Sequence, residues 1–312
     1  MSAEQKIYDM IVIGGGPGGF TAAMYGARSG MDVLVLERLS AGGQMALTHQ
    51  IDNYPGFENG IDGFELGQKM QQGAQRFGVR TIFAEVRSLN LKPQIKTVNT
   101  SEGSFCGKTI VFSTGAEPRT LGLAAEKELT GRGVHYCAAC DGMFYRGKTV
   151  VVVGGGNSAA GEASVLSKLA KKVILVHRRD TLRADKASIQ PLENADNVEY
   201  DWNSAVVELI REERLTGVRL RNVNTGEERV VECDGVFVSI GREPTTALVQ
   251  GQLTLDQRGY VAADETTCTN IPGVYAVGDV RAKAVRQIVT AVADGAAAAH
   301  FAQEYLAGIE KM

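Results

Sequence analysis

At 312 residues, with 44% hydrophobic and 22% charged side chains, the chain is an ordinary globular protein, long enough for about two domains. Its net charge of -3 attracts neither nucleic acid nor an anionic membrane, so neither is expected as a partner. The polar start, MSAEQKIYDM, lacks the pattern of a secretory signal, and no apolar run approaches the roughly 18 residues that span a bilayer. We therefore expect a cytoplasmic protein.

The first elements are predicted over residues 8–38, as strand, glycine-rich turn, amphipathic helix and strand. Gly14, Gly16 and Gly19 form G-x-G-x-x-G where the strand feeds the helix. Such a turn lets the backbone approach a pyrophosphate, and the helix N-terminus presents free N–H groups to it. Glu37 ends the next strand, where a carboxylate accepts from a ribose 2′-hydroxyl and repels a 2′-phosphate. The segment predicts a dinucleotide with an unphosphorylated adenosine ribose.

A Cys-X-X-Cys pair, Cys137 and Cys140, follows in GVHYCAACDG, residues 133–142. The chain has few cysteines, and in a reducing compartment such a pair is more often catalytic or metal-binding than a structural staple. A redox disulfide fits best, because the spacing permits a short-loop disulfide that exchanges through a mixed disulfide. Asp141 is placed to supply the proton that the leaving thiolate needs.

Three other interpretations of this stretch were weighed. Structural zinc needs four nitrogen or sulfur ligands, but the remaining cysteines and histidines are scattered along the chain. Two inert core thiols are possible for free cysteines, although the neighbouring alanines, Asp141 and Gly142 indicate a turn or short helix near solvent. Asp141 is equally compatible with a helix N-cap.

Residues 148–179 repeat the pattern of residues 8–38 at a constant offset. Gly154, Gly156 and Ala159 correspond to the three glycines of the first G-x-G-x-x-G motif, and His177 corresponds to Glu37. Three arginines follow, and arginine hydrogen bonds to phosphate contribute on the order of 1.5 to 3 kcal/mol each. An isolated run such as HRRDTLR usually forms a solvated basic face, but its position after the strand predicts a 2′-phosphate site and hence NADPH. The arginines are Arg178, Arg179 and Arg183.

The fold class predicted is therefore α/β, with two Rossmann-like dinucleotide-binding domains. Two similar segments, FSTGAEPR in the first copy and VSIGREPT in the second, end the two copies. Stretches of alternating polarity at 81–91 and 206–232 predict antiparallel strands. The tail predicts a hairpin and strand over 259–280 and a long Ala-rich helix over 284–308. Because the second copy has its own closing strand, we expect the tail to complete the first domain. The domains are 1–117 and 247–312 for one dinucleotide and 118–246 for the other.

Two dinucleotides in one chain suggest that one passes electrons to the other, and a flavin accepts a hydride from NADPH. FAD is therefore the expected occupant of the first site.

Over nearly its whole length the chain resembles the bacterial-type low-molecular-weight thioredoxin reductases. The resemblance rests on CAACDG just before the second glycine turn, HRRDTLR, GGQM, DNYPG, STGAEPR, YAVGDVR and RQI. Other disulfide reductases with two dinucleotide sites keep their cysteine pair near the first turn, where SAGGQMALTHQ has none. Members are usually homodimers in which one domain rotates against the other. NADPH–ferredoxin reductases share the architecture but lack the cysteine pair.

The resemblance implies roles for individual residues. Cys137 and Cys140 would be the redox pair, with Cys140 nearer the flavin, and Asp141 the general acid. Thr48 is the hydroxyl left from the family's threonine-rich run, and Thr245 replaces an asparagine. FAD would be held by Gly14, Gly16, Gly19, Glu37, Gln44, Thr48, Asn53, Gly115, Asp279, Arg286, Gln287 and Ile288. NADPH would be held by Gly154, Gly156, Asn157, Ser158, His177, Arg178, Arg179 and Arg183.

The predicted activity is NADPH- and FAD-dependent reduction of the disulfide of a thioredoxin or thioredoxin-like protein. A flavin-dependent dithiol oxidase of the same fold is the rival enzyme, but it has no need for the arginines. A zinc-binding, non-enzymatic module is the rival from another class.

Overall fold

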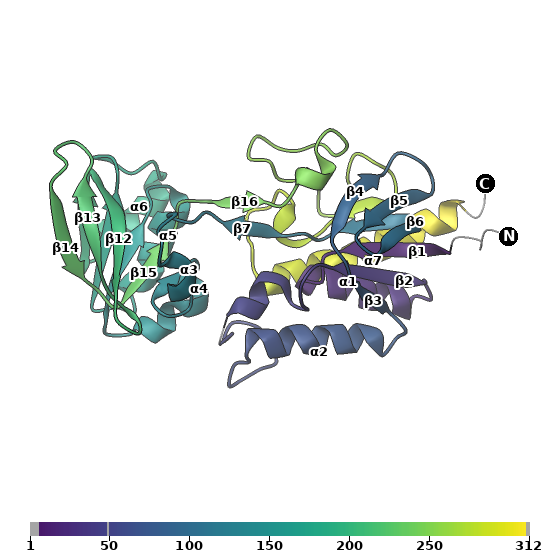
Figure 1. Cartoon of the computed structure of the whole chain (residues 1–312), viewed down its shortest axis with the longest axis horizontal. Coiled ribbons are helices and arrows are strands. Elements are labelled where there is room, and N and C mark those ends of the chain that lie inside the picture. The colour runs from purple at the N-terminus through teal and green to yellow at the C-terminus, as the bar shows by residue number, and fades with distance from the viewer. Residues whose placement is uncertain (1–5, 49, 310–312) are drawn as a thin grey trace. The chain divides into compact units, whose positions relative to one another are not determined.

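The computed structural model describes residues 6–48 and 50–309, and the chain forms two compact α/β units (Figure 1). The first unit comprises residues 1–117 and 243–312, and the second comprises residues 118–242. The chain passes between them twice, and the passing segments, β7 (Ala116–Pro118) and β16 (Arg242–Pro244), pair as a two-stranded sheet. Within the described ranges, no helix is long and apolar enough to cross a membrane.

A mixed sheet in the order β3-β2-β1-β6-β5-β4, with β17 paired to β6, forms the centre of the first unit. Strands β3, β2, β1, β6 and β17 run parallel, and β5 and β4 continue the sheet antiparallel. The strands are β1 (Ile7–Ile13), β2 (Val33–Glu37), β3 (Arg80–Phe83), β4 (Val86–Asn90), β5 (Lys96–Thr100), β6 (Gly103–Phe112) and β17 (Val274–Ala276). The helices are α1 (Pro17–Arg28), η1 (Gly43–Leu47), α2 (Gly63–Gln75), η3 (Ala247–Val249), η4 (Gly278–Val280) and α7 (Ile288–Ile309).

Small residues let α1 and α7 pack closely. A Cβ on Gly295 of α7 would lie 2.3 Å from the Gly18 carbonyl oxygen of α1, and a Cβ on Gly18 would lie 3.0 Å from the Ala291 carbonyl oxygen. Beneath the helices the sheet is apolar on both faces, because β1 and β2 are runs of buried aliphatic residues. The strand ends that carry the glycine turn are therefore fixed by a continuous core.

Three sequence predictions need correction in this unit. The prediction of antiparallel strands over 81–91 is wrong at the start of this stretch, because β3 pairs parallel with β2. It is confirmed at the end of the stretch, where β4 pairs antiparallel with β5. The hairpin expected over 259–280 is reduced to isolated bridges, such as that between Cys268 and Tyr275, before β17. The last helix begins at Ile288, four residues later than expected, because Arg286 and Gln287 belong to the preceding loop.

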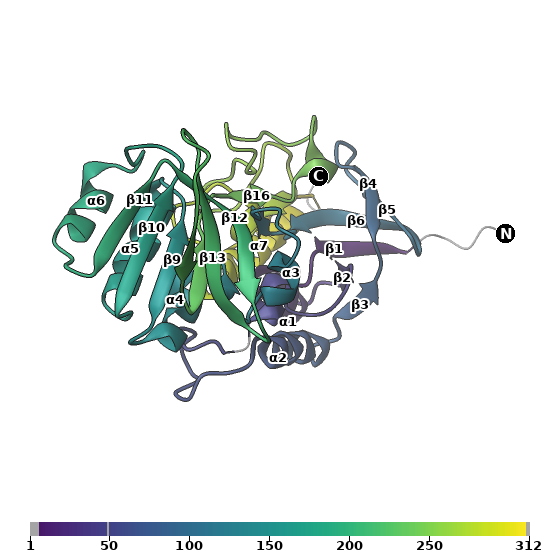
Figure 2. The ribbon, with the colours of Figure 1, turned by 60° about the vertical axis from the view of Figure 1, so that its left-hand side comes forward.

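The second unit contains a parallel sheet in the order β11-β10-β9-β15-β8, whose strands β9, β10 and β11 lie side by side in Figure 2. The expected antiparallel strands over 206–232 are confirmed as the sheet β12-β13-β14. The strands are β8 (Val134–His135), β9 (Thr149–Val153), β10 (Lys172–His177), β11 (Val198–Trp202), β12 (Ser204–Arg211), β13 (Leu215–Asn222), β14 (Glu228–Glu232) and β15 (Gly235–Val238). The helices are α3 (Glu126–Leu129), α4 (Ala138–Asp141), η2 (Gly142–Tyr145), α5 (Asn157–Ser167) and α6 (Lys186–Glu193).

Parallel strands bring their carboxyl ends to one edge of the sheet. In the second unit that edge collects His135 and the following cysteine pair from β8, Gly154 after β9, His177 at the end of β10 and Ser239 after β15. One edge therefore carries both the second glycine turn and the redox pair.

Candidate active site

The first glycine turn has the shape that a pyrophosphate requires. Gly14 has a φ of +102°, and a Cβ on Gly19 would lie 2.0 Å from the Gly14 carbonyl oxygen, so strand and helix meet too closely for side chains. A Cβ on Gly16 would meet nothing within 4 Å, which leaves open space in front of α1. No side chain caps α1, so its first-turn N–H groups are available to phosphate oxygens.

Glu37 lies beside this turn at the end of β2. Its carboxylate accepts from the Gly15 N–H at 2.6 Å and from the Leu39 N–H at 2.9 Å. These bonds fix the acid where a ribose would follow the pyrophosphate. The residues present fit an adenosine with a free 2′-hydroxyl.

The predicted residues of the early loops are arranged around the same turn. The Gly42 N–H donates to the Gly15 carbonyl at 2.8 Å, which places η1, with exposed Gln44, next to the turn. Thr48 directly follows η1 and is partly buried. The Asn53 amide donates to the Gln287 side-chain oxygen at 3.2 Å and so links two predicted FAD residues that are distant in sequence.

Arg286 lies in the loop before α7, with its guanidinium 4.0 Å from the ring of Tyr260. One of its terminal nitrogens donates to the Arg281 carbonyl at 3.3 Å, while its buried Nε has no partner among the described residues. Asp279 lies in η4, Ile288 opens α7, and Gly115 adopts a φ of +72° after β6. The structure places these residues in the first unit with the turn, as the sequence predicted, but their contacts with FAD stay a prediction.

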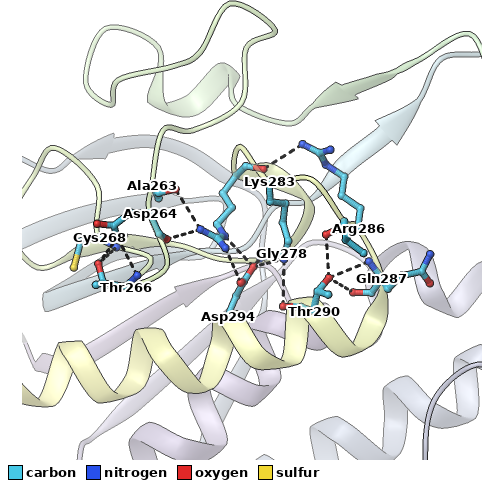
Figure 3. Close-up of polar contacts among 12 residues, drawn as sticks. Ala263, Asp264, Thr266, Cys268, Gly278, Lys283, Arg286, Gln287, Thr290 and Asp294 are labelled. Carbon is cyan, nitrogen blue, oxygen red and sulfur yellow. Dashed lines mark hydrogen bonds and ion pairs between the residues drawn. The ribbon is translucent and has the colours of Figure 1, made fainter. Parts of the chain in front are cut away.

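Asp294 was not predicted, yet it organises the loop that carries Asp279 (Figure 3). Its buried carboxylate accepts from the Gly278 N–H at 2.9 Å and pairs with Lys283 at 2.6 Å and Arg281 at 3.1 Å. Two cations and a backbone donor compensate its charge, so this buried carboxylate costs far less than an unpaired one. The available sequence signal was an acid within the apolar, Ala-rich first half of this helix.

The second glycine turn repeats the geometry of the first. Gly154 has a φ of +151°, and a Cβ there would lie 2.4 Å from the Ser239 carbonyl oxygen. A Cβ on Gly156 would meet nothing within 4 Å, and no side chain caps α5. Asn157 opens α5 and donates to the Asp185 carboxylate at 2.7 Å, with Ser158 next to it in the first turn. This turn also fits a pyrophosphate.

His177 and the arginines surround the adenosine end of the second turn. Burial, followed by the charges of the nearby arginines, lowers the pKa of His177, so its ring is neutral at physiological pH. Its Nε2 is buried without a partner among the described residues, and its ring fills the space beside Gly155. The Arg183 N–H donates to the Gly155 carbonyl at 2.7 Å. The side chains of Arg178, Arg179 and Arg183 are exposed, and no ion pair joins them to the described residues.

The redox pair lies in the second unit. Cys137 and Cys140 form a disulfide across the start of α4, with Cα atoms 5.3 Å apart, and both are partly buried. This confirms the disulfide interpretation over that of two separate thiols. Within residues 6–48 and 50–309, no group of three or more histidine, cysteine, aspartate and glutamate side chains is placed to hold a metal.

Asp141 ends α4 and occupies the N-cap position of η2, but its side chain makes no cap hydrogen bond there. Instead its Oδ2 lies 2.9 Å from His135 Nδ1, and His135 Nε2 lies 2.6 Å from the Tyr145 hydroxyl. His135 and Tyr145 are buried, and both pack against Phe237. Sequence reasoning missed His135 because only its spacing to the cysteines was tested, as a metal ligand.

Glu162 on α5, close to the cysteine pair, is a further acid that was not predicted. It accepts from the Ser239 hydroxyl and from the Ala138 N–H, which belongs to the residue after Cys137. Burial raises the pKa of Glu162 to about 7, although these hydrogen bonds and Arg242 oppose the shift. The carboxyl therefore changes protonation state close to neutral pH.

Replacing Glu162 by glutamine is expected to raise the free energy of unfolding of the second unit, relative to native protein, more at pH 8 than at pH 5. The folded carboxyl, with a pKa of about 7, holds a proton that the unfolded chain releases above its ordinary value of 4.5. Stability of the native protein therefore falls as pH rises from 4.5 to 7, by up to about 3 kcal/mol. Glutamine removes this loss. Urea unfolding followed by Trp202, the single tryptophan and part of this unit, measures the effect.

The exposed Glu213 provides the matched control, since Glu213→Gln should change stability equally at both pH values. If Glu162→Gln also shows the same difference from native protein at pH 5 and pH 8, the carboxyl does not titrate in this range.

The chain is similar to known proteins over nearly its whole length. The family model of the pyridine nucleotide-disulphide oxidoreductases matches residues 8–295. The thioredoxin reductase of Listeria monocytogenes is 43% identical and aligns over 98% of this chain and 96% of its own. The bifunctional thioredoxin reductase/thioredoxin of Mycobacterium leprae is 44% identical, over 98% of this chain and 67% of its own. The crystal structure of thioredoxin reductase from Streptococcus pyogenes superposes with a TM-score of 0.90 at 42% identity, covering 98% of this chain and 100% of that one.

Proposed function

The chain belongs to the thioredoxin reductases of the pyridine nucleotide-disulphide oxidoreductase family, and we propose that it uses NADPH to reduce the disulfide of a thioredoxin-like protein. This family depends on FAD and NADPH. The observation that carries the proposal is the Cys137–Cys140 disulfide at the same sheet edge as a glycine turn with unpaired arginines. The protein partner is supported by the Mycobacterium leprae relative, whose name joins a reductase and a thioredoxin in one chain.

We propose that the first unit holds FAD and the second holds NADPH. The Gly14–Gly19 turn and Glu37 would bind the FAD pyrophosphate and adenosine ribose, with the predicted loop residues up to Ile288 around the rest. The second turn, His177 and the three arginines would bind NADPH through its 2′-phosphate. When bound, FAD supplies the two-electron chemistry that links the nicotinamide to the disulfide.

The domain boundaries that we propose for this division are 1–117 with 247–312 and 118–246, which differ from the compact units in the placement of residues 243–246. A homodimer and a cytoplasmic location are further parts of the proposal. They rest on the family resemblance and on the reducing compartment in which a working dithiol persists.

An anaerobic NADPH titration tests the function. The purified protein should be yellow, its flavin absorbance should fall with added NADPH, and it should recover when an oxidised thioredoxin is supplied. NADPH donates the electrons and the Cys137–Cys140 pair passes them on, so recovery requires a disulfide substrate. A protein without flavin, or one whose absorbance stays low after thioredoxin is added but recovers with oxygen alone, would contradict the proposal. The second result would favour a dithiol oxidase.

A further inference from the structure

Both ring nitrogens of His135 are engaged, on opposite sides, beside the redox pair. Nδ1 faces Asp141 Oδ2 at 2.9 Å, and Nε2 faces the Tyr145 hydroxyl at 2.6 Å. The imidazole is 6% exposed and stacks on Phe237, with ring centroids 5.2 Å apart. The ring is therefore held in one orientation by packing as well as by hydrogen bonds.

Tyr145 fixes which nitrogen of His135 carries the proton. Burial raises the pKa of Tyr145 to about 12, so the phenol keeps its hydrogen at physiological pH. The Arg214 guanidinium acts on this oxygen and opposes the shift, and it has donors only. Among the described residues, the acceptor within reach of the phenol hydrogen is His135 Nε2. A neutral imidazole then carries its proton on Nδ1 and donates it to Asp141.

The hydrogen bond from Nδ1 engages one oxygen of Asp141 and leaves the other free. Asp141 follows Cys140 directly and ends the same short helix, so its orientation decides where a proton can be delivered. The other charged groups that act on this cluster are Glu162 from α5, Arg242 beside Glu162, and Arg214 and Asp234 near Tyr145.

We propose that His135, locked by Tyr145, is a positioning residue that aims Asp141 for proton transfer in thiol–disulfide exchange. The inference rests on the proposed function. In this exchange a thiolate of the reduced pair attacks one substrate sulfur, a mixed disulfide forms, and the substrate S–S bond breaks. Its electron pair leaves on the second substrate sulfur, which takes the proton that a protonated Asp141 carries on the oxygen not engaged by His135, so that Asp141 becomes a carboxylate. The remaining thiol of the pair returns a proton to Asp141, attacks the mixed disulfide and releases the other substrate sulfur as a thiolate.

Two amide substitutions separate the two ring nitrogens. The amide nitrogen of asparagine occupies the place of Nδ1, and that of glutamine the place of Nε2. His135→Asn should keep the bond to Asp141 and oxidise within about fivefold of the native rate, whereas His135→Gln should be about 10- to 30-fold slower. The measurement is single-turnover oxidation of the dithiol holoenzyme by oxidised thioredoxin. Tyr145→Phe keeps the aromatic ring at this position but no longer fixes the tautomer of His135. It should slow the same step less than His135→Gln does.

The leaving group distinguishes positioning of an acid from a structural role. Dithio-bis-nitrobenzoate releases a thiolate that is stable without a proton, so its reduction should be nearly unchanged in His135→Gln. Asp141→Asn should show the same selectivity, and the double variant should be no slower than Asp141→Asn alone. Equal slowing with both disulfides, or native rates with thioredoxin, would overturn the proposal. If native enzyme itself fails to reduce thioredoxin, the proposed function fails instead.

Discussion

Replacing either Cys137 or Cys140 by serine is expected to lower thioredoxin reduction at least about 1000-fold. One remaining thiol can form a mixed disulfide with the substrate, but it has no partner to release the product. Reduction of the flavin by NADPH should persist, because neither cysteine belongs to the glycine turns or the arginine set. The measurements are steady-state turnover with oxidised thioredoxin and stopped-flow flavin absorbance without it.

Two other cysteines provide controls for these variants. Burial raises the pKa of the Cys233 thiol to about 12, so it remains protonated, and Cys268 is exposed in the first unit. Serine at either position should leave turnover unchanged. More than a few percent of native turnover in a Cys137 or Cys140 variant would remove the pair from the electron path. The single-cysteine variant that accumulates a mixed disulfide with thioredoxin identifies the attacking sulfur.

The sequence predicted the parts of this site that depend on local geometry. Gly14, Gly19 and Gly154 are required by the backbone, since a side chain would collide with a neighbouring carbonyl, and such positions are visible as fixed spacing. The Cys-X-X-Cys disulfide also depends on residues close in sequence. The α/β class followed from the repeated strand–turn–helix pattern, which the mixed sheet of the first unit and the parallel sheet of the second confirm.

The parts that were missed depend on contacts made only in the folded chain. Asp294 reaches Gly278 from the next helix, and Glu162 of α5 accepts from Ser239, which follows β15 and lies 77 residues further along the chain. His135 is near Asp141 in sequence, but its role depends on Tyr145 and on burial against Phe237. A charged residue among apolar and small neighbours was the available signal for Glu162 and Asp294, and it does not reveal the partner.

Replacing both Arg178 and Arg179 by alanine is expected to raise the KM for NADPH about 10- to 100-fold and leave the KM for NADH within about twofold. Each charged hydrogen bond to the 2′-phosphate contributes about 1.5 to 3 kcal/mol, and a tenfold change corresponds to about 1.4 kcal/mol. The two side chains are exposed and have no ion pair within the described part of the chain. Their loss therefore breaks no ion pair of the described residues, and it removes charges that act on His177, whose burial still lowers its pKa. The effect then reports mainly phosphate binding.

Steady-state kinetics with both nucleotides measures the change, and added salt should weaken NADPH binding less in the variant than in native enzyme, because fewer charges are screened. The double variant Arg219→Ala and Arg221→Ala is the matched control: it removes two charges from β13, on the separate antiparallel sheet, where Arg219 pairs with Glu208 and Arg221 pairs with Glu228. That control should leave both KM values unchanged. If the double variant instead raises the KM for NADPH and NADH equally, the arginines support the fold of the site and do not select the phosphate. The second glycine turn alone would then bind either nucleotide, and His177 would be the remaining candidate for discrimination.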